Sequence, residues 1–487
     1  MTKKIRTILF LGLLFLFVII APSIIFYSWG YRFDFQTKAI VKTGAFYFKV
    51  LPKSAQISIT SLDNKGNLLK TKQISKKTDF FFGAALIENI LPQKYQVQIT
   101  KDGYFAWKKN LEIKGNSVVE AKNIVLIPQD VGINLIAQNV QNFFPSPDER
   151  TIILKEKAAT TTTSSAASSI TATTSGWSLK IFDVRNNVIS QLIDSRDIAK
   201  NTQIDLLDLN FSPASQSLLL KTQIKKQVKY YFIDLTQSSY KAVPLDFLTP
   251  ECQAIFFEPN NHQKLIFLKD SQVFEVDITE KATSSKMAEN VKSLELSGSD
   301  FYYLDNSGFL YKTNSSFARQ DKLNNAPFSF DKNSDYQIDV LSNWIFVQIG
   351  QKLYFLNSDT KSFEKFSDSV NEIKISPDFK KAVYYSDHEI SVLFLEPELG
   401  QPQKEKGQKV FIARFSDKIG RVFWLTSNYL IFNVGEKTKV AEIDDRDVIN
   451  IVNLTDSPSS EIYWNQNSKK LFINDSSNFY VTKQLVP

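Results

Sequence analysis

The stretch IKISPDFKKAVYY, residues 373–385, contains the pattern that decides the fold of most of this chain. Apolar side chains alternate with a lysine up to Ile375, a Ser-Pro-Asp turn follows, and a second apolar run begins at Ala382. Alternation of this kind predicts a half-buried strand, and Pro and Asp both favour turns. The stretch therefore predicts two short strands joined by a tight turn.

This pattern recurs along the chain after residue 128. The opening strands of the repeated units contain Phe144, Phe211, Phe256, Leu294, Ile338, Ile373, Val422 and Ile462. The units are spaced mostly by about 35 to 50 residues, the length of one four-stranded blade, and such sheets close into a ring to protect their edges. The sequence predicts eight units, with seven as the alternative because the unit boundaries are soft.

The first unit is longer than the others because it contains residues 158–175, AATTTTSSAASSITATTS. A tract of small polar residues has nothing to bury, so we expect a flexible hairpin tip there. Ser-Pro or Ser-Pro-Asp turns occur at residues 146–148, 212–213 and 376–378. On these turns, residues 131–487 resemble β-propellers of the TolB-like class. Because Pro fixes φ and Asp caps the turn, the turn aspartates are expected to be structural.

Near the N-terminus, residues 8–27 form an uncharged run that is long enough, at about 1.5 Å per residue, to span the roughly 30 Å hydrocarbon core of a bilayer. Lys3, Lys4 and Arg6 precede this run without an acid among them. The positive-inside rule then places residues 1–7 in the cytoplasm and the rest of the chain outside. We predict an uncleaved signal anchor at residues 8–29 of a single-pass cell-membrane protein, followed by a juxtamembrane segment at 30–45. A cleaved signal peptide is the alternative, but no small-residue cleavage site follows the run.

Residues 46–128 contain short alternating strands separated by turns, such as YQVQI at 95–99 and KDG at 101–103. This stretch resembles the PEGA domain family through LPKSA at 51–55, LPQKYQV at 91–97, KDGY at 101–104 and the closing strand IVLIP at 124–128. Ser54 and Lys94 stand where the family has glycines, and residues 62–82 are longer than its usual hairpin. The resemblance implies a small β-sandwich-like domain of bacterial surface proteins, often near the membrane and without catalytic residues.

Charge is distributed unevenly along the chain. The whole chain has a net charge of +7; residues 45–128 alone carry thirteen lysines and six acids, residues 1–44 are net +5, and the part after residue 128 is therefore net −5. Solvated strand faces are the simplest interpretation of the basic lobe at 46–128. The more specific hypothesis is that this lobe contacts anionic lipid or a wall polymer.

The sequence lacks the common catalytic and metal-binding motifs: it has no G-x-S-x-G elbow, H-E-x-x-H, paired C-x-x-C or P-loop. The two histidines, His262 and His388, are both expected in polar turns. Cys252 is the only cysteine, so no internal disulfide forms, which fits a bacterial surface protein. Its apolar surroundings predict a core residue in a strand rather than a nucleophile.

One acidic cluster, between two predicted strands, remains to be explained. The simplest interpretation is a solvated hairpin turn, and a calcium loop is the alternative because oxygen ligands alternate along it. The cluster consists of Glu442, Asp444, Asp445 and Asp447.

Together these features predict an all-β, membrane-anchored extracytoplasmic protein that binds protein, peptide or cell-wall glycan through its propeller and is not an enzyme. No catalytic, cofactor-binding or metal-binding residues are predicted. Nucleic acid is not expected as a partner, because the basic lobe lies outside the cell in this topology. The alternative function is that of a hydrolase or lyase that cleaves a surface polysaccharide with carboxylates in the propeller channel.

Overall fold

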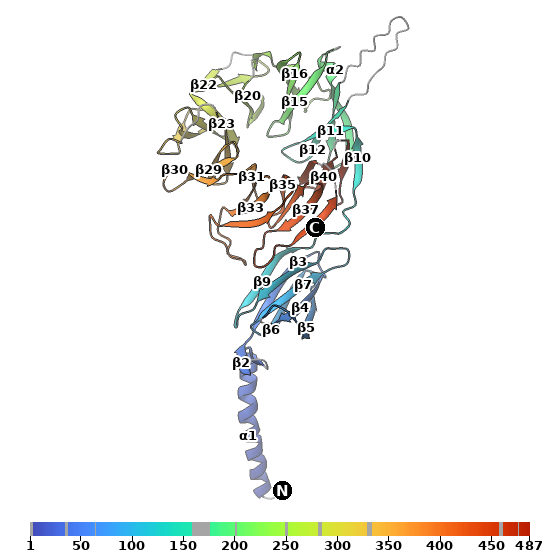
Figure 1. Ribbon diagram of the computed structural model, residues 1–487, viewed down its shortest axis with the longest axis vertical. Helices are drawn as coiled ribbons and strands as arrows, with labels where there is room; N and C mark the ends of the chain where they lie inside the picture. The colour runs from blue at the N-terminus through green and yellow to red at the C-terminus, as the bar shows by residue number, and fades with distance from the viewer. Residues whose placement is uncertain are drawn as a thin grey trace, which may run out of the picture.

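The computed structural model describes residues 3–34, 38–63, 65–157, 176–199, 202–248, 252–280, 285–328, 334–456, 461–475 and 477–487, without the side chains of residues 69–72. The predicted insertion at 158–175 lies outside the described residues. Figure 1 shows three bodies in a row: a helix at the N-terminus, a small pair of sheets, and a large ring of sheets. The prediction of a mainly β chain with one N-terminal apolar helix is confirmed.

The N-terminal helix, α1 (Lys3–Ser28), buries none of its side chains. With 26 residues, the helix is long and apolar enough to cross a membrane, and a signal sequence would meet the same criteria. The helix begins five residues before the uncharged run, because Lys3 to Thr7 continue the helical backbone. A hairpin follows it, formed by β1 (Tyr31–Asp34) and β2 (Ala39–Lys42).

The small body, called the sandwich below, consists of two facing sheets. In the first sheet β3 (Gly44–Leu51) lies between β6 (Ala84–Ile90) and β9 (Val118–Val125), antiparallel to β6 and parallel to β9. The order in the second sheet is β5 (Leu68–Lys77), β4 (Gln56–Leu62), β7 (Lys94–Thr100) and β8 (Trp107–Glu112). The sequence predicts the closing strand of this body at residues 124–128, but the strand observed there, β9, ends at Val125. Residues 126–128 instead turn toward the ring.

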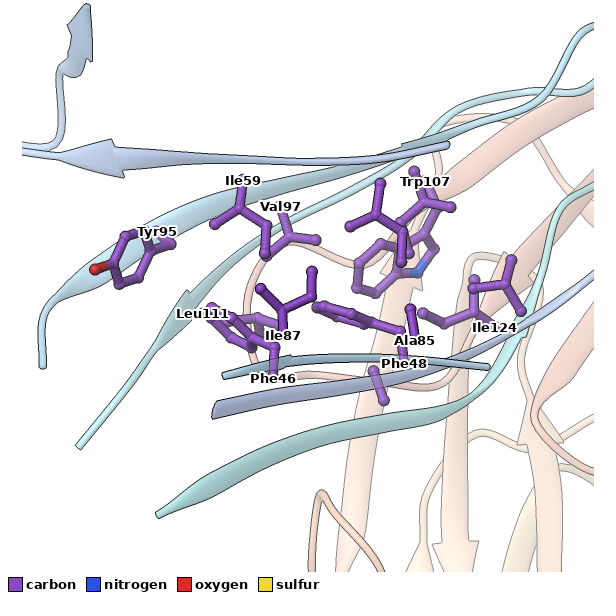
Figure 2. Packing of buried hydrophobic residues seen from close by; sticks show 14 of the residues in the cluster. Phe46, Phe48, Ile59, Ala85, Ile87, Tyr95, Val97, Trp107, Leu111 and Ile124 are labelled. Carbon is purple, nitrogen blue, oxygen red and sulfur yellow. The ribbon is translucent and has the colours of Figure 1, made fainter. Parts of the chain in front are cut away.

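Alternation along the strands creates the core of the sandwich. Side chains of β3 alternate between buried and partly exposed, so that Phe46 and Phe48 are fully buried between the sheets. Figure 2 shows these two rings among aliphatic residues, with Tyr95 at one end of the core and Trp107 at the other end, beside strands of the ring. Asp34 of the hairpin lies near enough to Tyr95 to act on its hydroxyl electrostatically, so the Tyr95 end faces α1.

The large body, called the ring below, contains eight four-stranded antiparallel sheets within the described residues. The first four are built from β11 (Val140–Pro145), β12 (Thr151–Lys157), β13 (Trp177–Asp183), β14 (Val188–Asp194); β15 (Ile204–Phe211), β16 (Ser217–Ile224), β17 (Gln227–Asp234), β18 (Val243–Pro244); β19 (Ala254–Glu258), β20 (Asn261–Lys269), β21 (Gln272–Asp277), β22 (Ser285–Glu289); and β23 (Val291–Ser297), β24 (Asp300–Asp305), β25 (Leu310–Asn314), β26 (Gln320–Lys322).

The remaining four sheets are built from β27 (Tyr336–Leu341), β28 (Trp344–Ile349), β29 (Lys352–Asn357), β30 (Ser362–Ser367); β31 (Glu372–Ile375), β32 (Lys381–Tyr385), β33 (Glu389–Phe394), β34 (Lys409–Arg414); β35 (Ile419–Thr426), β36 (Tyr429–Val434), β37 (Lys437–Glu442), β38 (Ile451–Asp456); and β39 (Glu461–Asn465), β40 (Lys470–Asn474), β41 (Asn478–Val481), β10 (Asn134–Gln138). A short helix α2 (Ser195–Ile198) and a 3-10 turn η1 (Asp246–Leu248) connect sheets.

Each sheet packs face to face on the next one around the ring. In the part of the ring that the structure describes, eight separate buried clusters lie between successive sheets, and each draws residues from two neighbouring sheets. The first strands of several neighbouring sheets also contact one another, namely β19 with β23, β23 with β27, β27 with β31 and β35 with β39, so these strands lie nearest the axis. A closed circle of radial four-stranded sheets is a β-propeller.

The ring is closed by strand β10, which the sequence did not predict. β10 precedes the first complete sheet in the chain but pairs with β41 at the C-terminus, with Ala137 opposite Phe479. Phe479 is fully buried and its ring centroid lies 5.2 Å from that of Phe143, in the first sheet. The last sheet therefore contains both ends of the ring segment, and at this seam β10 covers the edge of β41 that would otherwise be open.

The Ser-Pro-Asp turns are local structural devices. In the sixth sheet the Ser376 hydroxyl donates to Asp378 at 2.5 Å and accepts the Lys381 backbone N–H at 3.0 Å. The same pattern holds Ser146 and Asp148 in the first sheet, at 2.6 Å. Both carboxylates are thus used inside their own turns.

Candidate functional site

Two places in the structure bring chemically active side chains together: the junction between sandwich and ring, and the innermost strands of the ring. At the junction, the β37–β38 connection (residues 443–450) and the β33–β34 connection (residues 395–408) contact the free edges of the sandwich, as the hydrogen bonds below show. Figure 1 shows the sandwich directly below this part of the ring.

The free edge of β8 is covered by side chains of the ring. Asn450 accepts the Lys108 N–H at 3.3 Å through its carbonyl and donates to the Lys108 carbonyl at 3.1 Å. The Asp447 carboxylate accepts the Asn110 N–H at 2.8 Å. Side-chain groups thus take the place of a neighbouring strand, which satisfies an otherwise open edge.

The free edge of β9 is covered in the same way. The Gln401 amide donates to the Val118 carbonyl and accepts the Glu120 N–H, both at 3.0 Å. Arg446 donates to the Glu120 carbonyl at 2.7 Å, and the Val125 N–H donates to the Tyr429 hydroxyl at 3.0 Å. Both open edges on this side of the sandwich are therefore bound to the ring.

A buried ion pair lies at the centre of the junction. Lys109 is 0% exposed on β8, and its ammonium lies 2.8 Å from Oε1 of Glu442, whose side chain is 4% exposed. The same ammonium donates to the carbonyl of Asp444 at 2.6 Å. Glu442 also accepts the Trp107 indole N–H at 2.7 Å. Because both charges are fully partnered, burial of the pair is tolerated.

The acidic cluster lies at the hairpin between β37 and β38, as the sequence predicts, but it is a docking element and not a solvated turn, because only Asp445 of its four acids is exposed. Glu442 lies within β37, and Asp447 accepts a backbone N–H of the sandwich. Burial opposes ionisation of Asp444, but the hydrogen bond and charge of Arg446 outweigh it and lower the pKa. Asp445 pairs with Lys404 at 2.7 Å. All four carboxylates already have donors, and the described residues contain no group suited to a metal ion.

A pocket of about 190 Å³ opens beside this ion pair, between the sandwich and the ring. It is called the junction pocket below. Its apolar wall includes Trp107, Ile124, Phe394 and Tyr429, and its polar lining comprises Lys122, Asn123, Glu398, Gln401, Asn428, Glu442, Asp444 and Arg446. Clefts between two bodies of a protein are frequent ligand sites. The sequence did not indicate this pocket, because its walls come from segments about 280 residues apart in the chain.

Near the channel, charged side chains occupy the innermost strands of five successive sheets. They are Glu295 on β23, Asp339 on β27, Glu372 and Lys374 on β31, Arg421 on β35 and Glu461 on β39. In the sequence these residues had the appearance of solvated positions on alternating strands, so none of them was singled out.

Two of these acids have no cationic partner within the described residues. Burial, followed by the charge of Asp339, raises the pKa of Glu295 to about 7. Burial also raises the pKa of Asp339, with a smaller contribution from Glu372. Gln337 donates to one oxygen of Asp339 at 3.0 Å, and the other oxygen is buried without a partner in the described part of the chain.

The other side of this arc is already paired. Glu372 lies 2.9 Å from Lys374 and accepts the Tyr385 hydroxyl at 2.6 Å. Lys374 also lies over the Phe423 ring, 4.4 Å from its centroid. Arg421 pairs with Glu461 on β39, the innermost strand of the next sheet. The channel lining is thus mixed in charge and partly aromatic.

The histidines and the cysteine do not form a site. His262 lies on β20, not in a turn, and its Nδ1 is 2.7 Å from the hydroxyl of Ser217, which is fully buried and unreachable by a substrate. His388 is exposed in the turn before β33. Cys252 is buried as expected, although it lies just before β19 and not within a strand.

Comparison with known protein families and with curated proteins found no match. Among solved structures, the chain is similar to the C-terminal WD40 domain of Sif2, with a TM-score of 0.45, 11% identity, and coverage of 74% of this chain and 99% of that one. It is also similar to the computationally designed Ika8 protein, with a TM-score of 0.43, 11% identity, and coverage of 73% of this chain and 99% of that one. For BamB from Moraxella catarrhalis the TM-score is 0.40 at 12% identity, and the match covers 73% of this chain and 99% of that one. The propeller assignment rests on the sheet order and packing described above.

Proposed function

We propose that this chain is a membrane-anchored, extracytoplasmic binding or scaffold protein of a bacterial cell surface. In this proposal α1 is an uncleaved anchor with a cytoplasmic N-terminus, the sandwich is a PEGA-like stalk, and each of the eight sheets is one blade of a propeller head. The head binds a protein, a peptide or a cell-wall glycan. The junction supports this role, because edge-to-side-chain bonds and a buried ion pair hold the head in one orientation on its stalk.

The observation that carries the proposal is the mixed lining near the channel. Most charged groups there are already paired, and aromatic rings lie among them. Such a surface suits recognition of a polar partner, whereas an acid–base enzyme needs a pair of carboxylates free to act on a substrate. Propellers commonly bind through loops at one rim of the channel.

Site-specific photocross-linking of the full chain in its own membrane tests this role. A photoreactive residue at Gln337, an exposed position on innermost strand β27, should give a defined adduct. The same residue at Val188, which is 55% exposed on outer strand β14, is the matched control. Equal adducts at both positions, or none at Gln337 under several growth conditions, would contradict binding at the channel.

A second candidate function is supported by Glu295 and Asp339 alone. A carboxyl with a pKa of about 7 beside a second acid has the properties of a general acid in glycoside cleavage. Purified surface polysaccharide incubated with the full chain would then release new chain ends, and Glu295→Gln would abolish that release without abolishing binding. Release that is unaffected by Glu295→Gln would exclude this mechanism.

A further inference from the structure

Three consecutive phenylalanines form the most exposed aromatic group of the sandwich. Phe80, Phe81 and Phe82 are 75%, 74% and 73% exposed, in the turn between β5 and β6. They are called the phenylalanine turn below. Contiguous exposed apolar surface of this kind marks an interaction site, because single exposed residues are common but adjacent aromatic ones are costly in water.

Hydrogen bonds within the sandwich fix the backbone of the phenylalanine turn in the absence of a partner. The Asp79 carboxylate accepts the Phe82 N–H at 2.5 Å and the Ala84 N–H at 2.7 Å. Gly83 has a φ of +68°, and a Cβ there would lie 2.4 Å from the Val50 carbonyl oxygen, so only glycine fits. A preorganised turn loses little conformational freedom on binding.

The phenylalanine turn and the junction pocket both lie at the end of the sandwich that faces the ring. β3 begins beside the hairpin, where Asn116 donates to the Thr43 carbonyl, and ends toward the ring, where Leu126 donates to the Leu51 carbonyl. Gly83 accepts the Val50 N–H at 2.9 Å, so the phenylalanine turn is at the ring-facing end of the sandwich. The junction pocket is at that end too, since Trp107 lines it.

The two features also lie on opposite edges of the sandwich. β5 and β6 are neighbours at one side of the two sheets, and β8 and β9 are neighbours at the other. The phenylalanine turn joins the first pair, whereas the junction pocket opens at the second.

We propose that the phenylalanine turn of one chain inserts into the junction pocket of a second copy, so that the chains associate head to tail. The contact itself follows from the geometry above. The further consequence, that copies align side by side in the membrane plane, rests on the anchoring proposed above, which gives every copy the same orientation. A contact between two different surfaces propagates into a row or closes into a ring of subunits.

Size and polarity support this pairing. A dry cavity of about 150 Å³ is large enough to bind benzene, and the junction pocket has about 190 Å³ and an apolar wall. One phenyl ring of the turn therefore fits.

Charge supports the pairing as well. Lys53, Lys76 and Lys77 are exposed beside the turn. Among the charged residues that line the pocket, Asp444 is paired with Arg446, Glu442 with Lys109, and Lys122 with Glu120 at 2.6 Å. Within the described residues this leaves the carboxylate of Glu398 as the lining charge without an ion-pair partner. The basic sandwich of one copy would thus meet the acidic ring of the next.

The same charges argue against two other occupants. An isologous contact would place two lysine-rich surfaces against each other, which is repulsive. Insertion into the bilayer that α1 would span is disfavoured, because the turn is at the end of the sandwich away from α1.

Disulfide cross-linking of the full chain tests the proposal in a background carrying Cys252→Ala. Phe81→Cys chains are mixed with Asn123→Cys chains that carry a different tag, in detergent micelles and in vesicles. Asn123 is exposed at the pocket. We expect roughly tenfold more heterodimer than with Phe81→Cys and Val188→Cys, because a specific contact raises the local concentration of the two thiols. The double variant Phe81→Cys/Asn123→Cys should give a ladder of oligomers.

Each other outcome overturns a stated part of the proposal. Efficient Phe81→Cys homodimers would show an isologous contact. No heterodimer above the Val188→Cys control, with residue 81 shielded from a water-soluble maleimide, would show that bilayer or another protein covers the turn. Cross-linking in micelles but not in vesicles would retain the contact and contradict the shared orientation, and hence the anchoring proposal. Replacing all three phenylalanines by serine should abolish association in sedimentation experiments.

Discussion

Lys109 is a lysine at a core position of a strand. Its neighbours on the same face of β8, Trp107 and Leu111, are buried in the sandwich, and Lys109 is as buried as they are. The ammonium is acceptable only because Glu442 and two backbone carbonyls of the ring surround it. The sandwich and the ring are therefore coupled in stability, since either alone would contain an unpaired charge.

Lys109→Met is expected to destabilise the protein by about 3–5 kcal/mol, because it leaves Glu442 buried without its counter-charge. In the double variant Lys109→Met/Glu442→Gln both positions are neutral, so the second substitution should lower the free energy of unfolding by much less than the first one does. Chemical denaturation in detergent micelles measures both. Lys286→Met breaks an exposed pair with Glu289, 50% and 61% exposed, and should change the free energy of unfolding by under about 1 kcal/mol. Equal effects of Lys109→Met and Lys286→Met would contradict this account.

Glu295 makes stability depend on pH in a defined direction. Its pKa is about 7 in the folded chain, above the usual 4.5, so the folded state binds the proton more tightly than the unfolded state does. The resulting stability is present in full below about pH 4.5 and is lost as the pH rises to about 7, by up to about 3 kcal/mol.

Glu295→Gln should flatten this part of the stability profile, and Asp339→Asn should shift it to lower pH because one repelling charge is removed. Denaturation at a series of pH values between those limits measures the effect. Glu289→Gln, at an exposed position, is the control. A profile that is unchanged by Glu295→Gln would show that Glu295 does not titrate in this range.

At the scale of elements, the seam between the first and last sheets depends on one strand from each end of the ring. Phe479→Ala on β41 should cost about 3–5 kcal/mol, because it removes a fully buried ring that packs on both sheets. Val188→Ala on an outer strand should stay within about 0.5 kcal/mol. Thermal unfolding of the full chain followed by circular dichroism compares the two. A similar loss for both would mean that the seam contributes little.

Local patterns in the sequence were sufficient for the opening strands. Ile338 and Ile373 lie on β27 and β31, the innermost strands of their sheets, because alternation and turn chemistry act over a few residues. β10 was missed because its partner lies at the other end of the chain. The closing strand of the sandwich was placed too late, since IVLIP at 124–128 is apolar both in the strand and in the segment that packs on the ring.

The candidate site was harder to predict than the fold. Glu442 and Asp447 were recognised as a cluster, but sequence alone gave no sign that Asn110 and Lys109 lie opposite them. Glu295 and Asp339 were invisible for a related reason: an acid on an alternating strand has the same pattern whether it faces water or a narrow channel. Burial and neighbours, which decide the pKa, come only from tertiary structure.

At the scale of the whole molecule, the basic lobe has a testable preference for anionic surfaces. Lys42, Lys94 and Lys114 are exposed near the end of the sandwich that faces α1. For a chain without residues 1–29, we expect salt-sensitive co-sedimentation with vesicles that contain phosphatidylserine and none with neutral vesicles. Changing the three lysines to glutamine should weaken binding by roughly fivefold per lysine at low salt, because each lysine near the surface contributes about 1 kcal/mol.

The matched control changes Lys225 and Lys226, which are exposed in the ring, to glutamine. This variant should bind as the parent does. Binding to anionic vesicles that is insensitive to salt, or equal losses in both variants, would contradict a role for the basic lobe.

The pairing of β10 with β41 also determines when the ring can be completed. A ribosome makes Asn134–Gln138 long before it makes the strand that hydrogen-bonds to it, Asn478–Val481. Until β41 has been synthesised, β10 has an unpaired edge, which is a template for wrong pairing with neighbouring nascent chains. A chain that terminates before β41 would keep the edge of β10 unpaired permanently, and we expect quality-control proteases to degrade it.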